Sequence, residues 1–137
     1  MNAQKKMMEA AFAAGTSAGG ATDTDGLAKV ILKVENAVDP DWPATVNTVV
    51  LVPPGSSVYH MLLQAFKDGK IAFNASWYGQ YWSHFIDSLN GLKNQGFNYW
   101  NFQDGEGNEF DRGVDLISVY DGDVIKFRYV EYSLSFE

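Results

Sequence analysis

One segment with the pattern of a helix lies between stretches in which apolar and polar residues alternate, as they do in β-strands. This order restricts the folds that the chain can adopt. Its apolar residues recur at helical spacing: Val58, Met61, Leu62, Ala65 and Phe66. Ser56 or Ser57 offers an N-cap hydroxyl before this segment, and Gly69 suits a left-handed C-cap after it. The sequence therefore predicts one amphipathic helix of about three turns.

Strand patterns flank the predicted helix on both sides. Val30, Leu32 and Val34 share one face of a period-two pattern, and residues 45–52 are almost all β-branched, so the two stretches predict a hairpin. Further strand candidates follow the helix: the aromatic-rich stretches 77–89 and 97–102, and a last strand with Ile125, Phe127 and Tyr129 on one face. This order predicts the α+β class, as a β-grasp-like mixed sheet with the helix packed on one face.

The composition of the chain changes near its start. Residues 1–26 are rich in Ala, Gly, Thr and Ser, and they hold too little apolar surface to offset the entropy of ordering them. We expect a flexible lead-in there, with at most a marginal helix over 7–14. The full length of 137 residues suits one domain, so residues 27–137 are predicted to form it.

Charge and composition argue against several classes of function. The formal net charge is -7, and this excess of carboxylates disfavours nucleic acid as a partner. No run approaches the roughly 20 apolar residues that span a bilayer, which argues against membrane insertion. The absence of cysteine removes disulfides, thiolate nucleophiles and cysteine-ligated metals.

The sequence offers little that could support catalysis. His60 lies in the predicted helix, where a structural role is expected. His84 follows Ser83 in a strand, and because adjacent strand residues point to opposite faces, the two do not form a nucleophile–base pair. No phosphate loop, dinucleotide fingerprint or nucleophile elbow is present. We therefore predict that the protein is not an enzyme and uses no catalytic cofactor.

Four carboxylates lie close together in the sequence, at Asp104, Glu106, Glu109 and Asp111. Carboxylate oxygens are ligands that calcium prefers, but this spacing does not follow the Asp-x-Asp-x-Asp-Gly loop with its closing Glu. We interpret the cluster as a solvated turn that also carries glycines. No metal site is predicted.

Aromatic side chains are the most informative feature for function. They crowd one part of the chain: Trp77, Tyr78, Tyr81, Trp82, Phe85, Phe97, Tyr99, Trp100 and Phe102. Some of them must build the core, but a domain of this size with one helix has little room for all of them. Tyr and Trp combine a large apolar face with a polar tip, which suits a surface that grips a flat ligand or a partner. The sequence therefore predicts an aromatic binding surface.

These segments resemble the C-terminal β-domain of the transcobalamin and intrinsic factor family, and related stand-alone domains of bacterial surface proteins. The matching segments are Tyr81–Gly91, Tyr99-Trp100-Asn101-Phe102, Arg112-Gly113-Val114-Asp115 and Asp121–Phe127, with Ser57-Val58-Tyr59 at the helix start. Their order and spacing agree over residues 29–130. The resemblance implies that residues 27–137 are a transcobalamin-like β-domain.

In that family the β-domain lies over the upper face of cobalamin, so the resemblance implies cobalamin or another corrinoid as the ligand. The implied contacts are Tyr81, Trp82, Ser83, His84, Phe85, Ile86, Trp100, Asn101, Phe102 and Phe110. Asn101 stands where the family usually has Gln, a longer amide with the same hydrogen-bonding groups. His84 replaces an aliphatic residue; a neutral imidazole there has the chemistry to reach cobalt, although a rim or structural role is favoured.

The family holds the lower side of cobalamin with a helical barrel, for which 137 residues leave no room. We therefore expect the domain alone to bind weakly, and a separate helical-barrel chain is a candidate partner. The resemblance also implies a secreted or cell-surface protein. The alternative is an interaction module in which the same aromatic surface docks a protein or a glycan at a cell surface.

Overall fold

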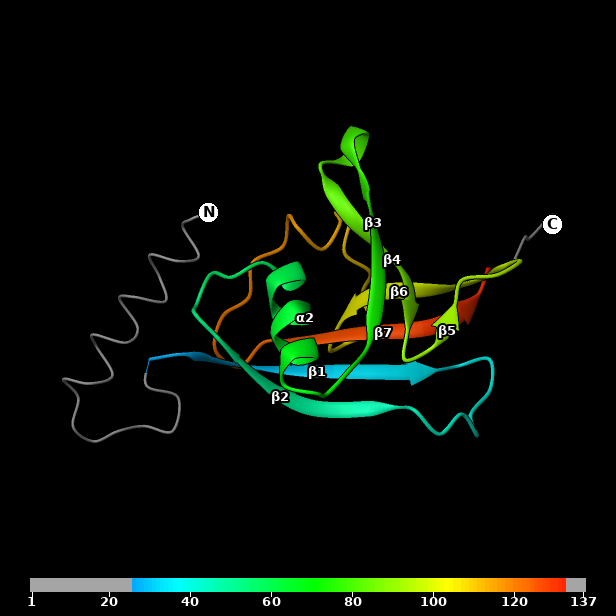
Figure 1. The fold of residues 1–137 in the computed structure, drawn as a ribbon, viewed down its shortest axis with the longest axis horizontal. Helices are drawn as coiled ribbons and strands as arrows, with labels where there is room; N and C mark the ends of the chain where they lie inside the picture. Colours follow the sequence, from blue (N-terminus) through cyan, green and yellow to red (C-terminus); the bar gives the residue numbers. More distant parts are fainter. Residues whose placement is uncertain (1–25, 133–137) are drawn as a thin grey trace.

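The computed structural model describes residues 26–132. The predicted lead-in before residue 26, with its marginal helix, lies outside the described residues. The elements in chain order are β1 (Ala28–Asn36), β2 (Val46–Val52), α2 (Val58–Lys67), β3 (Phe73–Tyr78), the short 3-10 helix η1 (Gly79–Tyr81), β4 (Ser83–Leu89), β5 (Leu92–Lys93), β6 (Asn98–Asp104) and β7 (Val124–Glu131) (Figure 1).

The main sheet has four strands in the order β2-β1-β7-β6. Strand β1 is antiparallel to β2, with Ala28 opposite Val52 and Val34 opposite Val46, as the predicted hairpin requires. The same strand is parallel to β7, where Leu32 pairs with Ile125. Helix α2 packs on one face of this sheet (Figure 1). The predicted α+β class, with one helix on a mixed sheet, is confirmed.

Helix α2 begins and ends close to the predicted positions. The Ser57 hydroxyl accepts a hydrogen bond from the backbone N–H of His60 at 3.1 Å, which is the N-cap interaction. At the other end Gly69 has a φ of +77°, in the left-handed region that favours glycine. Phe66 was expected on the buried face but is 54% exposed. It lies about 80° around the helix from Val58, which places it at the edge of the apolar stripe.

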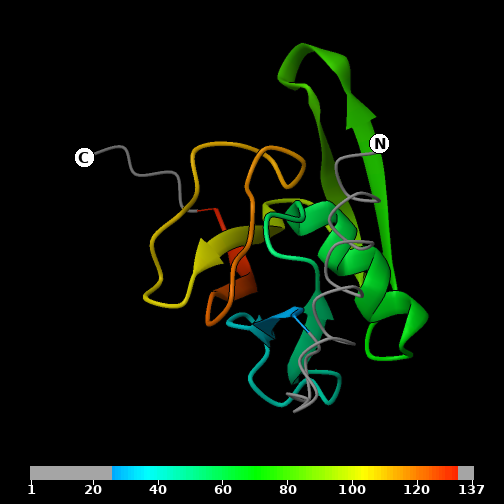
Figure 2. The same ribbon diagram turned by 90° about the vertical axis from the view of Figure 1, so that its left-hand side faces the viewer.

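A second sheet, of three antiparallel strands in the order β3-β4-β5, was not anticipated. Its long β3–β4 hairpin projects from the body of the molecule, beyond α2 (Figures 1 and 2). Strand β5 pairs only with Ser88 and Leu89, so residues 83–86 of β4 have one edge without a strand partner. A period-two pattern locates strands, but it does not specify which sheet each strand joins.

The connection between β6 and β7 runs beside the start of α2. The backbone N–H groups of Val58 and Tyr59 donate to the carbonyls of Ile117 and Val114, at 2.9 and 3.1 Å. This connection therefore lies against the start of the helix, and its Asp115 also contacts the start of β4 at Ser83 and His84. No helix within residues 26–132 is long and apolar enough to cross a membrane.

Candidate functional site

The β3–β4 hairpin carries a concentration of exposed aromatic side chains. Residues 71–86 include no Lys, Arg, Asp or Glu, in a chain whose net charge is -7. The exposed rings are Trp77, Tyr78, Tyr81, Trp82 and Phe85. Exposed apolar surface of this kind, on a projecting element with few charges, is typical of a binding site.

The tip of the hairpin is held in an unusual conformation. Trp82 has a φ of +54°, in the left-handed region that a bulky residue seldom adopts. Its backbone N–H donates to the carbonyl of Gly79 at 3.1 Å, which closes the turn. The indole is 72% exposed. The turn therefore holds a tryptophan in solvent at the end of the hairpin.

Phe85 is the centre of the aromatic group on one face of the hairpin. Its ring meets those of Tyr78 and Tyr81 edge to face, with ring centroids 5.5 Å apart in each pair. On the other face, Trp77 and His84 are cross-strand neighbours, and their ring centroids lie 5.2 Å apart. The hairpin thus presents two aromatic faces.

Three cavities adjoin Phe85, and we call them together the Phe85 hollow. The largest, of about 460 Å³, is lined by Tyr81, Phe85, Phe110, Asp111, Arg112, Gly113 and Leu116. The second, of about 260 Å³, is lined by Tyr78, Tyr81, Phe85, Ile86, Asp87 and Asn94. The third, of about 170 Å³, is lined by His84, Phe85, Ile86, Asn94, Tyr99, Trp100, Phe102, Gly113, Val114 and Phe127. Most of the site residues predicted from the sequence meet here.

Trp100 borders the hollow, but most of its side chain belongs to the core. Only 7% of the residue is exposed. Its indole N–H donates to the carbonyl of Leu92 at 2.8 Å, and its ring packs against Trp42 and Tyr129. Trp100 therefore supports the wall of the smallest cavity from within.

Phe102 and Phe110 connect the core to the hollow. The ring of Phe102 stacks on buried Phe127, with centroids 5.2 Å apart, and meets Phe110 at 4.4 Å. Phe110 then lines the largest cavity, from a segment outside the hairpin. The walls of the hollow therefore come from two parts of the chain.

Asn101, Ser83 and Trp82 do not line the hollow. Asn101 follows Trp100 in β6, so its side chain leaves the opposite face of the strand. There its amide donates to Glu109 at 2.6 Å and to the Tyr99 hydroxyl at 3.2 Å. Its Oδ1 is buried and has no hydrogen-bond partner among the described residues.

His84 and Asp115 form a hydrogen-bonded pair that sequence reasoning missed. Nδ1 of His84 lies 3.0 and 3.1 Å from the two carboxylate oxygens of Asp115. The same carboxylate accepts the backbone N–H of His84 at 2.7 Å and lies 3.1 Å from the Ser83 hydroxyl. Ser83 therefore contacts Asp115 and not the imidazole, which agrees with the expectation that Ser83 and His84 form no catalytic pair.

Gly113 explains why Asp115 can come so close to β4. A Cβ atom at this position would collide with the side chain of Ser83 and lie 3.3 Å from the carbonyl oxygen of His84. Glycine is therefore required for the chain to pass Ser83 here. The Arg112-Gly113-Val114-Asp115 motif was the available signal for this contact, although the sequence does not say what Asp115 meets.

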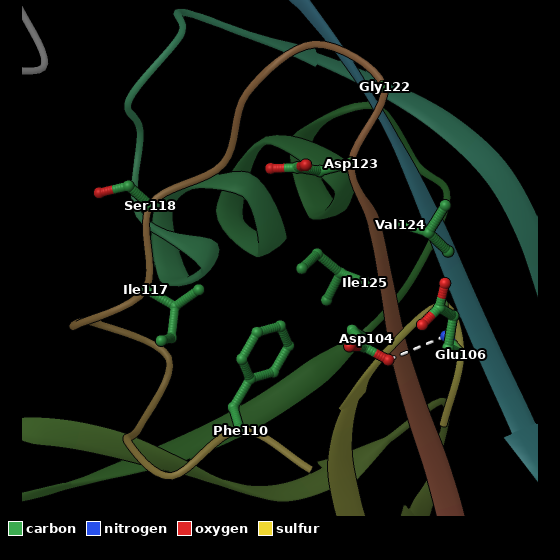
Figure 3. A pocket seen from close by; sticks show the side chains of 10 residues that line it. Asp104, Glu106, Phe110, Ile117, Ser118, Gly122, Asp123, Val124 and Ile125 are labelled. Atoms are coloured by element: carbon green, nitrogen blue, oxygen red, sulfur yellow. Dashed lines mark hydrogen bonds between the residues drawn. The ribbon is translucent and has the colours of Figure 1, made fainter. Parts of the chain in front are cut away.

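Two carboxylates of the predicted acidic turn, Asp104 and Glu106, lie at a fourth cavity of about 400 Å³, which shares Phe110 with the Phe85 hollow (Figure 3). The lining of this fourth cavity is Asp104, Gly105, Glu106, Phe110, Ile117, Ser118, Gly122, Asp123, Val124 and Ile125. Hydrogen bonds from the backbone of Asn108 and then of Glu106 hold the pKa of Asp104 below its ordinary value of 3.8. No group of three or more His, Asp or Glu side chains within residues 26–132 is placed to hold a metal ion.

Comparison with known proteins gives fold relatives only. No protein-family profile and no curated protein matches the sequence. The structure is similar to haptocorrin in complex with Cbi, with a TM-score of 0.66 and 23% identity over 85% of this chain and 28% of haptocorrin. It is also similar to a protein from Ruminococcus gnavus described as a candidate metal-binding protein, with a TM-score of 0.52 and 15% identity over 77% and 99% of the two chains. Because haptocorrin belongs to the transcobalamin family, the predicted resemblance is confirmed at the level of the fold.

Proposed function

We propose that the domain is a non-catalytic module that binds cobalamin or a related corrinoid at the β3–β4 hairpin. The observation that carries the proposal is the Phe85 hollow, whose cavities are lined by aromatic rings of an exposed hairpin that has no charged residue from 71 to 86. Its support from outside the chain is the fold shared with haptocorrin, whose ligand in the similar structure, Cbi, is a cobalamin analogue.

The chemistry of the hollow suits a large ligand with an apolar body and polar edges. Tyr81, Phe85 and Phe110 supply aromatic rings to the lining of the largest cavity. Asn94 and Asp87 add polar side chains to the lining of the second cavity; the Asn94 amide is already bonded to the backbone of Ile86 and Trp100, which leaves Asp87 as the stronger acceptor for a ligand. Such a site buries apolar surface and orients the ligand with a few hydrogen bonds.

The remaining predicted residues have supporting roles in this proposal. Ile86 and His84 border the hollow from β4, and Trp82 extends the contact beyond it at the tip. Trp100 and Phe102 fix the walls from the core side. Ser83 and Asn101 hold the neighbouring segments through Asp115 and Glu109.

The hollow covers only one side of a ligand, and this chain spans 28% of the length of haptocorrin. Because affinity depends on how much of the ligand is enclosed, we expect the domain alone to bind weakly. A separate helical-barrel chain would enclose the other side and raise the affinity. Since haptocorrin is a secreted protein, we propose a secreted or cell-surface location for this one as well.

Calorimetric titration of the protein with cyanocobalamin tests the proposal. Phe85→Ala and Tyr81→Ala should each weaken binding by about tenfold or more, since each removes a central aromatic contact. The matched controls are Phe66→Ala and Tyr120→Ala, exposed rings of the same types away from the hollow, with Tyr120 55% and Tyr81 58% exposed. Absence of heat at millimolar cyanocobalamin, with a folded protein, would refute the proposal.

A second function is favoured by the two tryptophans that do not line the hollow. Trp77 and Trp82 are 53% and 72% exposed, and a ligand seated beside Phe85 would not need either ring. These rings suit the docking of a protein or glycan at a cell surface. In that case Trp82→Ala should abolish binding to cell surfaces, while cyanocobalamin neither binds nor competes.

A further inference from the structure

We propose that the second cavity of the Phe85 hollow binds a quaternary ammonium group, of the kind that a trimethylammonium compound carries. The inference goes beyond the proposed function, because it assigns to this cavity a small organic cation, which is a different class of ligand. It is carried by three aromatic rings and one carboxylate that line the same space.

The aromatic lining of the second cavity consists of Tyr78, Tyr81 and Phe85. The ring of Phe85 lies at 87° to that of Tyr78 and at 72° to that of Tyr81, with centroids 5.5 Å apart in both pairs. Rings at such angles do not stack, so each forms a separate part of the lining. A cation is attracted to an aromatic face within about 6 Å of the ring centroid, so centroids this close together let one cation interact with more than one ring.

A carboxylate in the same lining supplies the opposite charge. Oδ2 of Asp87 accepts the Ser76 hydroxyl at 2.5 Å, which holds the side chain in place, and no described residue donates to Oδ1. Among the described residues, no Lys or Arg lines this cavity. The formal net charge of -7 adds a field that attracts cations to the molecule as a whole. The cavity therefore combines ring faces with an acceptor that is available to a cation.

The other polar groups of the lining favour a quaternary over a primary ammonium. Both ends of the Asn94 amide are occupied, since Nδ2 donates to the Ile86 carbonyl and Oδ1 accepts the backbone N–H of Trp100, at 2.9 Å each. A primary ammonium has three N–H groups that need acceptors. A quaternary ammonium has no N–H group, and it is the cation for which aromatic cages are best known.

The size of the cavity fits one such group. Its volume of about 260 Å³ is below the roughly 300–1,000 Å³ of pockets that enclose a drug-sized ligand. Tyr81 and Phe85 also line the largest cavity, whereas Tyr78 and Asp87 line only the second of the three. Variants of Tyr78 and Asp87 are therefore the specific tests of this cavity.

Calorimetric titration of the protein with choline tests the inference, and we expect saturable one-to-one binding. The control compound is the uncharged carbon isostere of choline, in which a tert-butyl group replaces the trimethylammonium group. It has the same shape without the charge, so it should bind at least about tenfold more weakly. This comparison uses the unaltered protein and does not depend on the folding of a variant. Equal binding of the two compounds, or no saturable binding of choline, would overturn the inference.

Two variants test the assigned contacts. Tyr78→Ala removes one ring, and Asp87→Asn removes the charge but keeps an acceptor oxygen. Each should weaken choline binding about threefold or more, the effect of losing one contact to the cation. The matched controls are Tyr120→Ala, which removes a 55% exposed tyrosine away from the hollow, and Asp68→Asn, an exposed carboxylate that also accepts a side-chain hydrogen bond, at 2.9 Å. Equal weakening by Asp68→Asn would overturn the inference, because net charge alone would then attract the cation.

Vesicles of phosphatidylcholine distinguish two sources of the same group. Cosedimentation that choline displaces and that Tyr78→Ala abolishes would assign the trimethylammonium group to a lipid headgroup. Choline binding without cosedimentation would assign it to a soluble molecule, and either result supports the inference. The cation site and the proposed function also fail separately. Choline binding without cyanocobalamin binding refutes only the corrinoid proposal, and the reverse result refutes only the cation site.

Discussion

At the scale of single residues, Trp100 shows that a segment can resemble a ligand-binding motif while one of its residues belongs to the core. It stands in the aromatic segment that resembles a ligand contact, yet its ring is enclosed by Trp42 and Tyr129 and its N–H is bonded to Leu92. Phe85 and Tyr81, in contrast, expose their rings beside cavities. Binding is therefore better tested at the hairpin than at Trp100.

Trp100→Ala should lower the free energy of unfolding by about 3–5 kcal/mol, the usual cost of deleting a buried aromatic side chain. The loss includes the cavity left between Trp42 and Tyr129 and the unpaired carbonyl of Leu92. Urea denaturation followed by circular dichroism measures it, with Phe97→Ala, a 59% exposed aromatic, as the control. A cost for Trp100→Ala as small as that of the control would show that Trp100 contributes little to the core.

The site residues differ in how far the sequence could predict them. The exposure of Tyr81 and Phe85 could be anticipated, because too many rings crowd one uncharged stretch for all to be buried. The partner of His84 could not, since Asp115 lies 31 residues away and reaches it only because Gly113 passes so close to Ser83. Contacts between distant segments follow from tertiary packing, which a period in the sequence does not encode.

At the scale of elements, the turn after β6 depends on one carboxylate. Oδ1 of Asp104 accepts the backbone N–H groups of Glu106 and Asn108, at 2.8 and 3.0 Å. These bonds favour the ionised form, so the pKa of Asp104 lies below its ordinary value of 3.8. The turn therefore closes on a charge that is present at neutral pH.

Acidification should loosen this turn. Because the folded pKa is lowered, the stabilising effect of Asp104 is complete above about pH 3.8 and is lost as the pH falls through the folded pKa. Amide chemical shifts of Glu106 and Asn108 should titrate together, with a midpoint below 3.8. Asp104→Asn keeps an acceptor oxygen without an acid group, so the transition should vanish in that variant. A midpoint above 3.8 in the native protein would contradict the assigned hydrogen bonds.

The elements themselves were easier to predict than their partners. The β1–β2 hairpin and α2 follow from local patterns, and both are found close to the expected residues. The separation of β3, β4 and β5 into their own sheet could not be predicted from these patterns. Strands β3 and β4 hydrogen-bond to each other across a short turn, and the main sheet is completed by β6 and β7. The aromatic hairpin projects for this reason.

At the scale of the whole molecule, the two sheets differ in how many neighbouring strands pair with each strand. Strands β1 and β7 are each paired on both sides and surround fully buried residues such as Leu32 and Phe127. The far half of the β3–β4 hairpin has only its own two strands, since β5 pairs no further along β4 than Ser88. Isolated two-stranded segments are marginal in water, so this part should open locally while the main sheet stays folded.

Amide hydrogen exchange should therefore divide the molecule in two. We expect Leu32 and Phe127 to exchange only through global unfolding, while Tyr78 and Phe85 exchange much faster through local opening of the hairpin. A ligand seated at the Phe85 hollow joins the hairpin to the segment around Phe110, so saturating cyanocobalamin should slow exchange at Tyr78 and Phe85 and leave the main sheet unchanged. Protection that appears on the main sheet instead would place the ligand elsewhere, and the flexible aromatic hairpin would then be best suited to docking a macromolecule.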